Sequence, residues 1–371
     1  MLTKVIIQNF KSFKNSQIPL KKFNVIIGPN ASGKSNFLDA LEFISSDVSI
    51  PDLVKKNGGF EAISYGSHKE PIIFTCEFVL ENRTFMYRFE ISNKDEKPQL
   101  EREILQIDKK AIFEVARDST GIFFLKMKGT KQNLNTDILF QKRLPRVIKY
   151  ERDISKELKD AWTFISSWRV YNFIPHMMKK TLPITRTMTL SKYGDNLAQV
   201  LHTFLTERRD IFLDIEDSLK EAIPEIEELL TPLSEDNRVS VAVRESGFKD
   251  KFSFYQISDG TFRLLAYITA LKTDAQLLAF EEPENSVHPW LLEMLIELMK
   301  NSDKQVIITT HSSKLLDKVN VEDVLVVEKK HGASIFSRIA SKKDIEKIKR
   351  LLERGVTLGE QWVSNVFGGV P

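Results

Sequence analysis

The clearest shortage in this sequence of 371 residues is that of cysteine. Cys76 is the single cysteine, so an intrachain disulfide and a thiol-rich metal site are both excluded, and a reducing cytoplasm fits. No uncharged apolar run approaches the roughly 20 residues that cross a bilayer, and the first residues lack the layout of a signal peptide. These absences predict a cytoplasmic protein that does not enter a membrane.

Charge and repetition are also modest. The formal net charge is only +3, which does not demand a nucleic-acid partner. Hydrophobic residues make up 42% and charged residues 28% of the sequence, as in ordinary soluble globular proteins. The sequence contains no internal repeat, and heptads do not persist through its helical stretches, so a long coiled coil is not expected.

One segment near the N-terminus organises the rest of the sequence. Residues 28–35 read Gly-Pro-Asn-Ala-Ser-Gly-Lys-Ser, the phosphate-loop pattern of two glycines around four residues followed by Lys and Ser. A buried strand is expected before it and a helix after it, so backbone N–H groups and a helix N-terminus would face an anion. Lys34 would reach the outer phosphates, and Ser35 would help to hold Mg²⁺. The nucleotide-binding candidates here are Asn30, Ala31, Ser32, Gly33, Lys34, Ser35 and Asn36.

Two alternatives stay open at this point. A turn rich in Gly and Ser can simply cap a helix without binding a nucleotide. Lys11, within the aromatic stretch 9–13, is either a solvated lysine at a strand edge or a second cation near the nucleotide.

The pattern along the chain predicts three parts. Residues 1–150 form an N-terminal ATPase half, in which short alternating runs between 70 and 128 are typical of an antiparallel meander. Residues 151–235 form a helical lobe whose helical pattern continues to Leu230, with breaks at Pro224 and Pro232. Residues 236–371 form a C-terminal ATPase half. A basic stretch is either solvated surface or a contact with a nucleic-acid backbone; it contains Lys126, Lys128, Lys131, Lys142, Arg143, Arg146 and Lys149.

A second anion site is indicated by residues 257–261, which open a helical run. Ser258 and Gly260 at a helix start repeat the physics of the phosphate loop, and we take both as nucleotide-binding candidates. A purely structural interpretation is that Ser258 is an N-cap and that Gly260 eases the turn.

Polar groups also follow two apolar strands. Glu281 and Glu282 end the run 277–282, and in a strand they would point to opposite faces, so they cannot share one role. We expect Glu281 to hold Mg²⁺ through water and Glu282 to polarise the attacking water. His311 follows the strand 305–310 and would donate to the γ-phosphate. The alternatives are two acids that cap the next helix and a structural histidine.

The order of these motifs resembles that of the ABC-type ATPases of the chromosome-maintenance, RecF and OLD branch. It is most similar to the stand-alone bacterial AAA-like predicted ATPases. The resemblance rests on the element 5–13, the phosphate loop, the signature loop 257–261, the segment 277–289 and Thr310-His311. It implies an α/β P-loop ABC-type head with a mixed sheet, an antiparallel β lobe and an inserted helical lobe.

The resemblance also implies a mechanism. Two heads meet head-to-tail around ATP and Mg²⁺, and Ser258 and Gly260 act in trans. The residues that act in cis are Lys34, Ser35, Glu281, Glu282 and His311. Glu281 stands where the family usually has Asp, which implies slow turnover, and the family's Q-loop glutamine has no clear counterpart between Ser35 and Glu70.

The leading hypothesis is an ATPase switch that dimerises around ATP and regulates a separately encoded effector, a nuclease in phage defence or genome protection. It follows from an ATPase head without a visible effector domain. The alternatives are a RecF-like DNA repair clamp and a scaffold that binds ATP without hydrolysing it.

Overall fold

The computed structural model divides the chain into two compact units. Unit 1 comprises Met1–Trp168 with Val321–Pro371, and unit 2 comprises Arg169–Asn320. The division into 1–150, 151–235 and 236–371 stays a prediction from the sequence. The structure describes residues 1–66, 70–94, 97–117, 123–127, 130–133, 154–285, 287–339 and 342–368.

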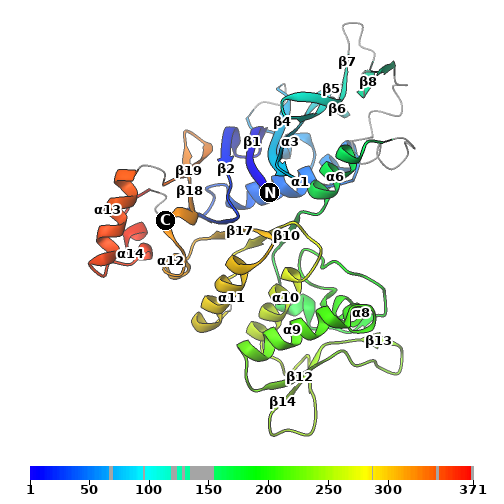
Figure 1. The fold of residues 1–371 in the computed structure, drawn as a ribbon, viewed down its shortest axis with the longest axis vertical. Coiled ribbons are helices and arrows are strands. Elements are labelled where there is room, and N and C mark those ends of the chain that lie inside the picture. Colours follow the sequence, from blue (N-terminus) through cyan, green and yellow to red (C-terminus); the bar gives the residue numbers. More distant parts are fainter. Residues whose placement is uncertain are drawn as a thin grey trace. The chain divides into compact units, whose positions relative to one another are not determined.

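Unit 1 contains an antiparallel sheet of eight strands in the order β2-β1-β4-β5-β6-β7-β8-β9 (Figure 1). Its side chains alternate between the core and the other face: along β5, Phe85, Tyr87 and Phe89 are buried, and the residues between them are only half-buried. This sheet is the antiparallel lobe that the sequence predicted. Residues 134–149, with much of the predicted basic stretch, lie outside the described residues. The strands are β1 (Leu2–Phe10), β2 (Phe13–Pro19), β4 (Ile72–Leu80), β5 (Arg83–Lys94), β6 (Lys97–Ile107), β7 (Lys110–Arg117), β8 (Phe123–Met127) and β9 (Thr130–Asn133).

A second group of strands in unit 1 carries the phosphate loop. The strand β3 (Phe23–Ile27) is buried at every position, as expected for a parallel strand covered on both faces. It runs parallel to β18 (Val324–Lys330), which pairs antiparallel with β19 (Ala333–Arg338). The helices of this unit are α1 (Lys34–Ser45), α2 (Ile50–Lys56), α3 (Phe60–Ile63), α6 (Lys156–Ser166), α13 (Lys342–Glu353) and α14 (Leu358–Val363), with a 3-10 turn η1 (Val321–Asp323).

Unit 2 is built on three parallel strands. The strand β16 (Leu277–Glu281) lies between β10 (Arg169–Tyr171) and β17 (Gln305–Thr310), so the carboxyl ends of all three meet at one edge. The helix α10 (Asp259–Leu271) packs against them, with the Tyr267 ring 5.2 Å from that of Phe280. The other helices are α7 (Pro175–Met178), α8 (Leu197–Glu207), α9 (Arg209–Ala222), α11 (Pro289–Asn301) and α12 (Ser313–Leu316).

The helix ends before Pro224, where a break was expected, but the expectation that helix resumes as far as Leu230 is wrong. The helix α9 ends at Ala222, and residues 226–230 form the strand β12 of a small antiparallel sheet. Pro224 explains the difference, because proline disfavours helical backbone at the residue before it and provides no N–H to continue the helix. The remaining strands are β11 (Leu182–Pro183), β12 (Ile226–Leu230), β13 (Arg238–Val239), β14 (Ala242–Glu245) and β15 (Phe252–Ser253).

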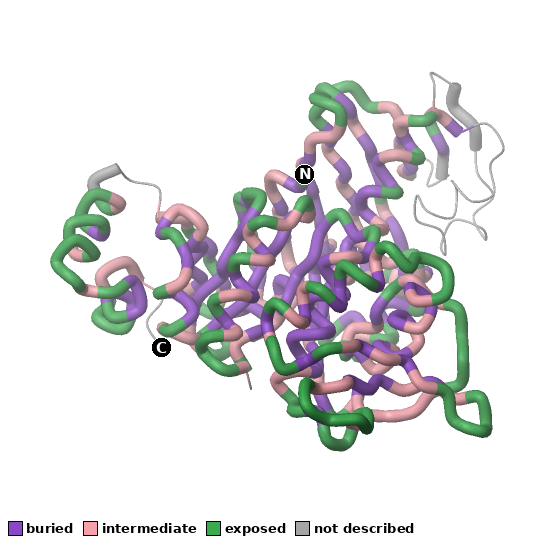
Figure 2. Tube along the Cα trace, turned by 60° about the horizontal axis from the view of Figure 1, so that its bottom comes forward, coloured by how far each residue is buried: buried purple, intermediate pink, exposed green. Residues whose placement is uncertain are grey.

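Burial follows the strands. Figure 2 shows buried residues along the strands and exposed residues at turns and on outer helix faces. The longest helix in the described part of the chain is α9, with 14 residues. Among the same residues, no helix combines the length and apolar character that a membrane span requires.

Candidate active site

The phosphate loop connects β3 to α1, and the structure requires glycine at both glycine positions of the sequence pattern, Gly28 and Gly33. Gly33 has a φ of 113° and Ala31 a φ of 61°, so the backbone turns through the left-handed region just before the helix. A Cβ on Gly33 would lie 2.2 Å from Ser334 Oγ, and a Cβ on Gly28 would lie 2.2 Å from the Val327 carbonyl oxygen. No side chain fits at either position, because the two glycines pack directly against β18 and β19.

Two serines brace the loop from outside it. Ser334 Oγ donates to the Ser32 carbonyl oxygen at 2.5 Å and lies 2.7 Å from Ser12 Oγ. Asn36 Nδ2, in the first turn of α1, donates to Ser12 Oγ at 2.8 Å. Sequence reasoning missed Ser12 and Ser334, because the contact between Ser334 and Ser32 joins residues 302 positions apart.

The groups inside the loop suit an anion. Lys34 is buried, and its Nζ donates to the carbonyl oxygens of Gly28 at 2.6 Å and Pro29 at 3.0 Å. Ser32 is 1% exposed, and its Oγ has no hydrogen-bond partner within the described part of the chain. An unsatisfied buried hydroxyl costs free energy, and the first turn of α1, where Ser35 lies, carries no acidic residue. A phosphate group would satisfy the hydroxyl, the ammonium and the helix N-terminus together.

Lys11 was expected to be either a solvated lysine at a strand edge or a second cation near the nucleotide, and its surroundings fit neither description completely. Its backbone has a φ of 48°, and its Nζ forms an ion pair with Asp39 Oδ2 of α1 at 2.7 Å. The ammonium is therefore held against the helix that the phosphate loop begins. A direct contact between Lys11 and a nucleotide stays a prediction.

The two adjacent carboxylates in unit 2 have different partners. Glu281 ends β16, and its Oε2 accepts from Asn172 Nδ2 at 2.9 Å. Glu282 N continues the ladder by donating to the Thr309 carbonyl oxygen at 2.9 Å, and Glu282 has a φ of 46°. A non-glycine residue in the left-handed region is strained, and such strain is often stored at functional sites.

The carboxylate of Glu282 is held by two side chains. Its Oε1 lies 2.7 Å from Nδ1 of His311, and its Oε2 accepts from Asn285 Nδ2 at 2.9 Å. Because a carboxylate only accepts, Nδ1 carries the proton and Nε2 is the ring atom left for another partner. His311 can donate to a phosphate only when Nε2 is protonated as well. Sequence reasoning missed Asn285, although it lies only three residues from Glu282.

A third carboxylate supports the histidine. Thr310 Oγ1 donates to Glu284 Oε1 at 2.5 Å and accepts from Ser312 N at 2.9 Å, which fixes the turn that carries His311. Burial is the largest cause that raises the pKa of the Glu284 carboxyl above its usual range, and the Thr310 hydroxyl opposes it. The role of Glu284 was also missed.

Ser258 is the N-cap of α10, as the structural interpretation proposed. Its Oγ accepts from Thr261 N at 3.1 Å and lies 2.8 Å from Thr261 Oγ1. Ser258 is exposed and Gly260 is half-buried, so the turn is open to a ligand. The capping geometry does not exclude the predicted role in nucleotide binding.

The candidate residues fall into two sets. Unit 1 carries Lys11 and residues 30–36, and unit 2 carries Ser258, Gly260, Glu281, Glu282 and His311. Within unit 2 the structure brings Glu282 and His311 into contact. Among the residues that the structure describes, no group of three or more His, Cys, Asp or Glu side chains could hold a metal ion.

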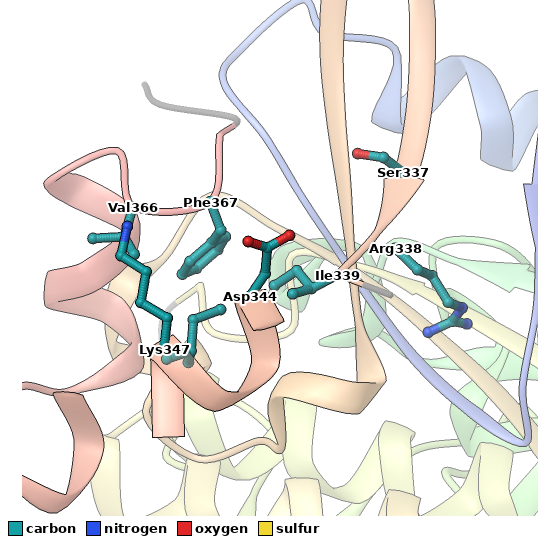
Figure 3. A pocket seen from close by; sticks show the side chains of 8 residues that line it. Ser337, Arg338, Ile339, Asp344, Lys347, Val366 and Phe367 are labelled. Carbon is teal, nitrogen blue, oxygen red and sulfur yellow. The ribbon is translucent and has the colours of Figure 1, made fainter. Parts of the chain in front are cut away.

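A cavity of about 420 Å³ in unit 1 contains none of these candidates. Figure 3 shows Phe367 of the C-terminal segment between the side chains of Asp344 and Lys347, with Val366 beside Lys347, while the guanidinium of Arg338 points away. The cavity has no feature of the phosphate loop or of the carboxylate pair.

The fold and the phosphate loop define an α/β P-loop ATPase head, and comparison with known proteins gives its family. Residues 23–317 match the family described as "AAA domain, putative AbiEii toxin, Type IV TA system". The match covers most of the chain, so the chain belongs to this family. It is an ATP hydrolase of the kind related to the SMC and RecF proteins.

Individual relatives agree with this assignment. An "ATP/GTP phosphatase" of Helicobacter pylori is 22% identical over 362 residues, which cover 91% of this chain and 92% of that protein. Human structural maintenance of chromosomes protein 1B is 41% identical over 66 residues, and this match covers 17% of this chain and 5% of that protein.

Two solved structures show the fold. An Smc head bound to the C-winged helix domain of ScpA has a TM-score of 0.60 at 15% identity, covering 92% of this chain and 99% of that one. An Smc head from Pyrococcus furiosus, with an extended coiled coil and bound to the C-terminal domain of ScpA, has a TM-score of 0.56 at 15% identity, covering 95% and 98%. Both confirm the expected ABC-type head fold.

Proposed function

We propose that this chain is an ATP-driven switch in which the phosphate loop and the Glu282–His311 pair act on one ATP. The family match supports this, because residues 23–317 include the phosphate loop and all the candidate residues of unit 2. The observation that carries the proposal is the carboxylate of Glu282, which follows a buried parallel strand and is oriented by His311 and Asn285. Such a group suits the positioning of a water molecule for phosphoryl transfer.

The hydrolytic step assigns one role to each residue. Water attacks the γ-phosphorus, a new P–O bond forms, and the bond from phosphorus to the β–γ bridging oxygen breaks. Glu282 accepts the proton of the water, and the products are ADP and inorganic phosphate. Lys34 exchanges its contacts with Gly28 and Pro29 for phosphate oxygens, and His311 donates from Nε2 to the γ-phosphate.

Mg²⁺ fits the donors present. Ser35 and Glu281 would hold it, and it would neutralise charge on the β- and γ-phosphates. Mg²⁺ in nucleotide sites keeps several waters and needs only one or two protein ligands. The lack of a three-residue acidic cluster among the described residues is therefore no objection. Glu281 is already oriented by Asn172.

The signature loop would serve a second copy of the chain. Ser258 and Gly260 lie at the exposed N-terminus of α10, where backbone N–H groups and the helix dipole favour an anion. We propose a head-to-tail dimer in which these residues close on the ATP of the partner subunit. Binding of ATP would select the dimer, and hydrolysis would release it.

The switch would act on a separately encoded effector, a nuclease in a bacterial defence or genome-protection system. The family description, which names a toxin and a toxin–antitoxin system, supports a defence setting. The related Smc heads are described as bound to domains of ScpA, which supports a protein partner. The single buried cysteine suits the cytoplasm. A DNA partner stays a prediction.

Phosphate release and particle mass test the proposal together. Wild type should release phosphate from ATP with Mg²⁺, and Lys34→Ala should release little. The Glu282→Gln variant should form a dimer in light scattering when ATP is present and remain monomeric without it. Equal phosphate release by wild type and Lys34→Ala, or no assembly of Glu282→Gln with ATP, would contradict the proposal.

A further inference from the structure

A short segment of unit 2 contacts both the metal-side carboxylate and the signature loop. It comprises residues 172–179 and is called here the bridging segment. Asn172 directly follows β10, and Lys179 directly follows α7. At one end Asn172 donates to Glu281 Oε2 at 2.9 Å, and at the other Lys179 holds the turn before α10. The sequence pattern assigns no role to either residue.

Lys179 makes two contacts with the signature loop and one with the helix that follows it. Its Nζ donates to the Ile257 carbonyl oxygen at 2.6 Å, pairs with Asp259 Oδ1 at 2.6 Å and lies 5.5 Å from the centre of the Phe262 ring. The side chain of Asp259 is 61% exposed and that of Lys179 only 18%. An exposed ion pair contributes little, so the bond to the carbonyl of buried Ile257 is the contact that fixes the loop.

The position of this lysine is electrostatically unfavourable for the helix alone. A cation near a helix N-terminus opposes the positive end of the macrodipole. Asp259 in the first turn of α10 offsets that repulsion. A lysine that must be compensated in this way adds little to helix stability, and its contacts are better explained by a need to hold residues 257–259 in one conformation.

The bridging segment is anchored along its length. Asn172 N donates to the Lys192 carbonyl oxygen at 2.9 Å, and Ile174 N donates to that of Tyr193 at 3.2 Å. The Phe173 ring lies 5.0 Å from that of Tyr267 on α10. Because these contacts hold the segment at several points, a shift of Asn172 would be transmitted to Lys179.

We infer that Asn172 and Lys179 are positioning residues, and that the bridging segment couples the metal-side carboxylate to the signature loop. The inference rests on the proposed function. Asn172 orients Glu281, which serves the ATP of its own subunit. Lys179 orients Ser258 and Gly260, which serve the ATP of the partner. Occupancy of one site therefore adjusts the geometry offered to the other.

Kinetics of four variants test the inference. Lys179→Met should lower kcat about tenfold or more, because small misplacements of positioning groups are costly, while binding of a fluorescent ATP analogue to the monomer stays unchanged. Lys179→Arg keeps the cation and its donors and should recover most of the loss. Asn172→Ala should raise the Mg²⁺ concentration for half-maximal activity about 10- to 100-fold, as for other residues that orient a metal ligand. Lys180→Met, next in sequence and paired with Asp195 at 3.5 Å, is the matched control and should behave as wild type.

The double variant tests the coupling itself. The rate of ATP hydrolysis is compared at one fixed Mg²⁺ concentration for the two single variants and the double variant. If the segment acts as one unit, the fold-decrease in rate for Asn172→Ala with Lys179→Met should be smaller than the product of the two single fold-decreases. Multiplicative losses, or a Lys179→Met enzyme with unchanged kcat and dimerisation, would overturn the inference while leaving the proposed function standing. No phosphate release by wild type would overturn both. If Lys179→Met does not fold, Lys179→Gln, whose shorter side chain weakens the bond to the Ile257 carbonyl oxygen, should show a smaller loss of kcat in the same direction, and an unchanged kcat there would count against the coupling.

Discussion

Replacing Glu282 by glutamine should stop ATP hydrolysis while ATP binding continues. The carboxylate accepts from His311 at 2.7 Å and from Asn285 at 2.9 Å. Glutamine has the same shape, but its amide offers one acceptor oxygen and an NH₂ group that only donates. One of the two neighbours must then face a donor, and the group that accepts the proton of water is gone.

The expected loss is large for catalysis and small for stability. A positioned general base contributes about 10²- to 10⁴-fold to a rate, which corresponds to about 3–5 kcal/mol of activation free energy. An unsatisfied buried donor costs about 1–3 kcal/mol, but the side chain of His311 is 46% exposed, so water can replace the lost contact. The change in the free energy of unfolding should therefore lie at the low end of that range.

Single-turnover phosphate release at saturating ATP and Mg²⁺ measures the effect directly. Asn285→Ala is the matched control, because it removes one hydrogen bond and keeps the carboxylate; its rate should fall only about tenfold, as for loss of a supporting contact. Thermal melting and nucleotide binding are measured alongside. The assignment is refuted if Glu282→Gln retains more than about a tenth of the wild-type rate, or if Asn285→Ala loses as much.

Three further outcomes are expected. Gly28→Ala should destabilise unit 1 by about 1–3 kcal/mol and weaken nucleotide binding, because its Cβ would meet the Val327 carbonyl oxygen at 2.2 Å; denaturant titration that shows no change would contradict this. Burial raises the pKa of Glu284, so the wild-type free energy of unfolding should fall as pH rises above the ordinary value of 4.5 and on through the raised pKa. Glu284→Gln should flatten that part of the stability–pH curve, and a parallel curve would show that Glu284 is not its source. If the chain is instead a DNA clamp, ATP-dependent binding to duplex DNA should weaken steeply with salt, and a flat salt response would exclude it.

The parts of the site that could be predicted are contiguous in sequence. The phosphate loop, the acids after β16 and the histidine after β17 each occur where a buried strand ends, and an apolar run marks that position without any structure. Their supporting contacts join distant segments. Asn172 and Glu281 are 109 positions apart, and no local pattern links an asparagine after a three-residue strand to that carboxylate.

The prediction of secondary structure was wrong for the residues after Pro224, where the helical spacing of apolar residues continues but the helix does not. The helical spacing of apolar residues continues beyond Ala222, but Pro224 ends the helix, and residues 226–230 pair with β14. The buried residues of that strand are Ile226 and Leu229. Periodicity averages over a window and gives a single proline little weight, although the proline decides the backbone there.

The structural and functional interpretations of Ser258 are compatible, and this bears on how the switch could work. As an N-cap, Ser258 accepts from Thr261 N, which uses one lone pair of its oxygen and leaves its proton to donate either to Thr261 Oγ1 or to a phosphate. The helix start is thus complete without a ligand, and a phosphate would require only rotation of a hydroxyl. A loop that is formed in advance contributes no ordering cost when the partner's ATP arrives. The strain of the site lies instead at Glu282, which has a φ of 46° and is held by its contacts with His311 and Asn285. Assembly would therefore depend on a rigid signature loop, and turnover on a strained carboxylate.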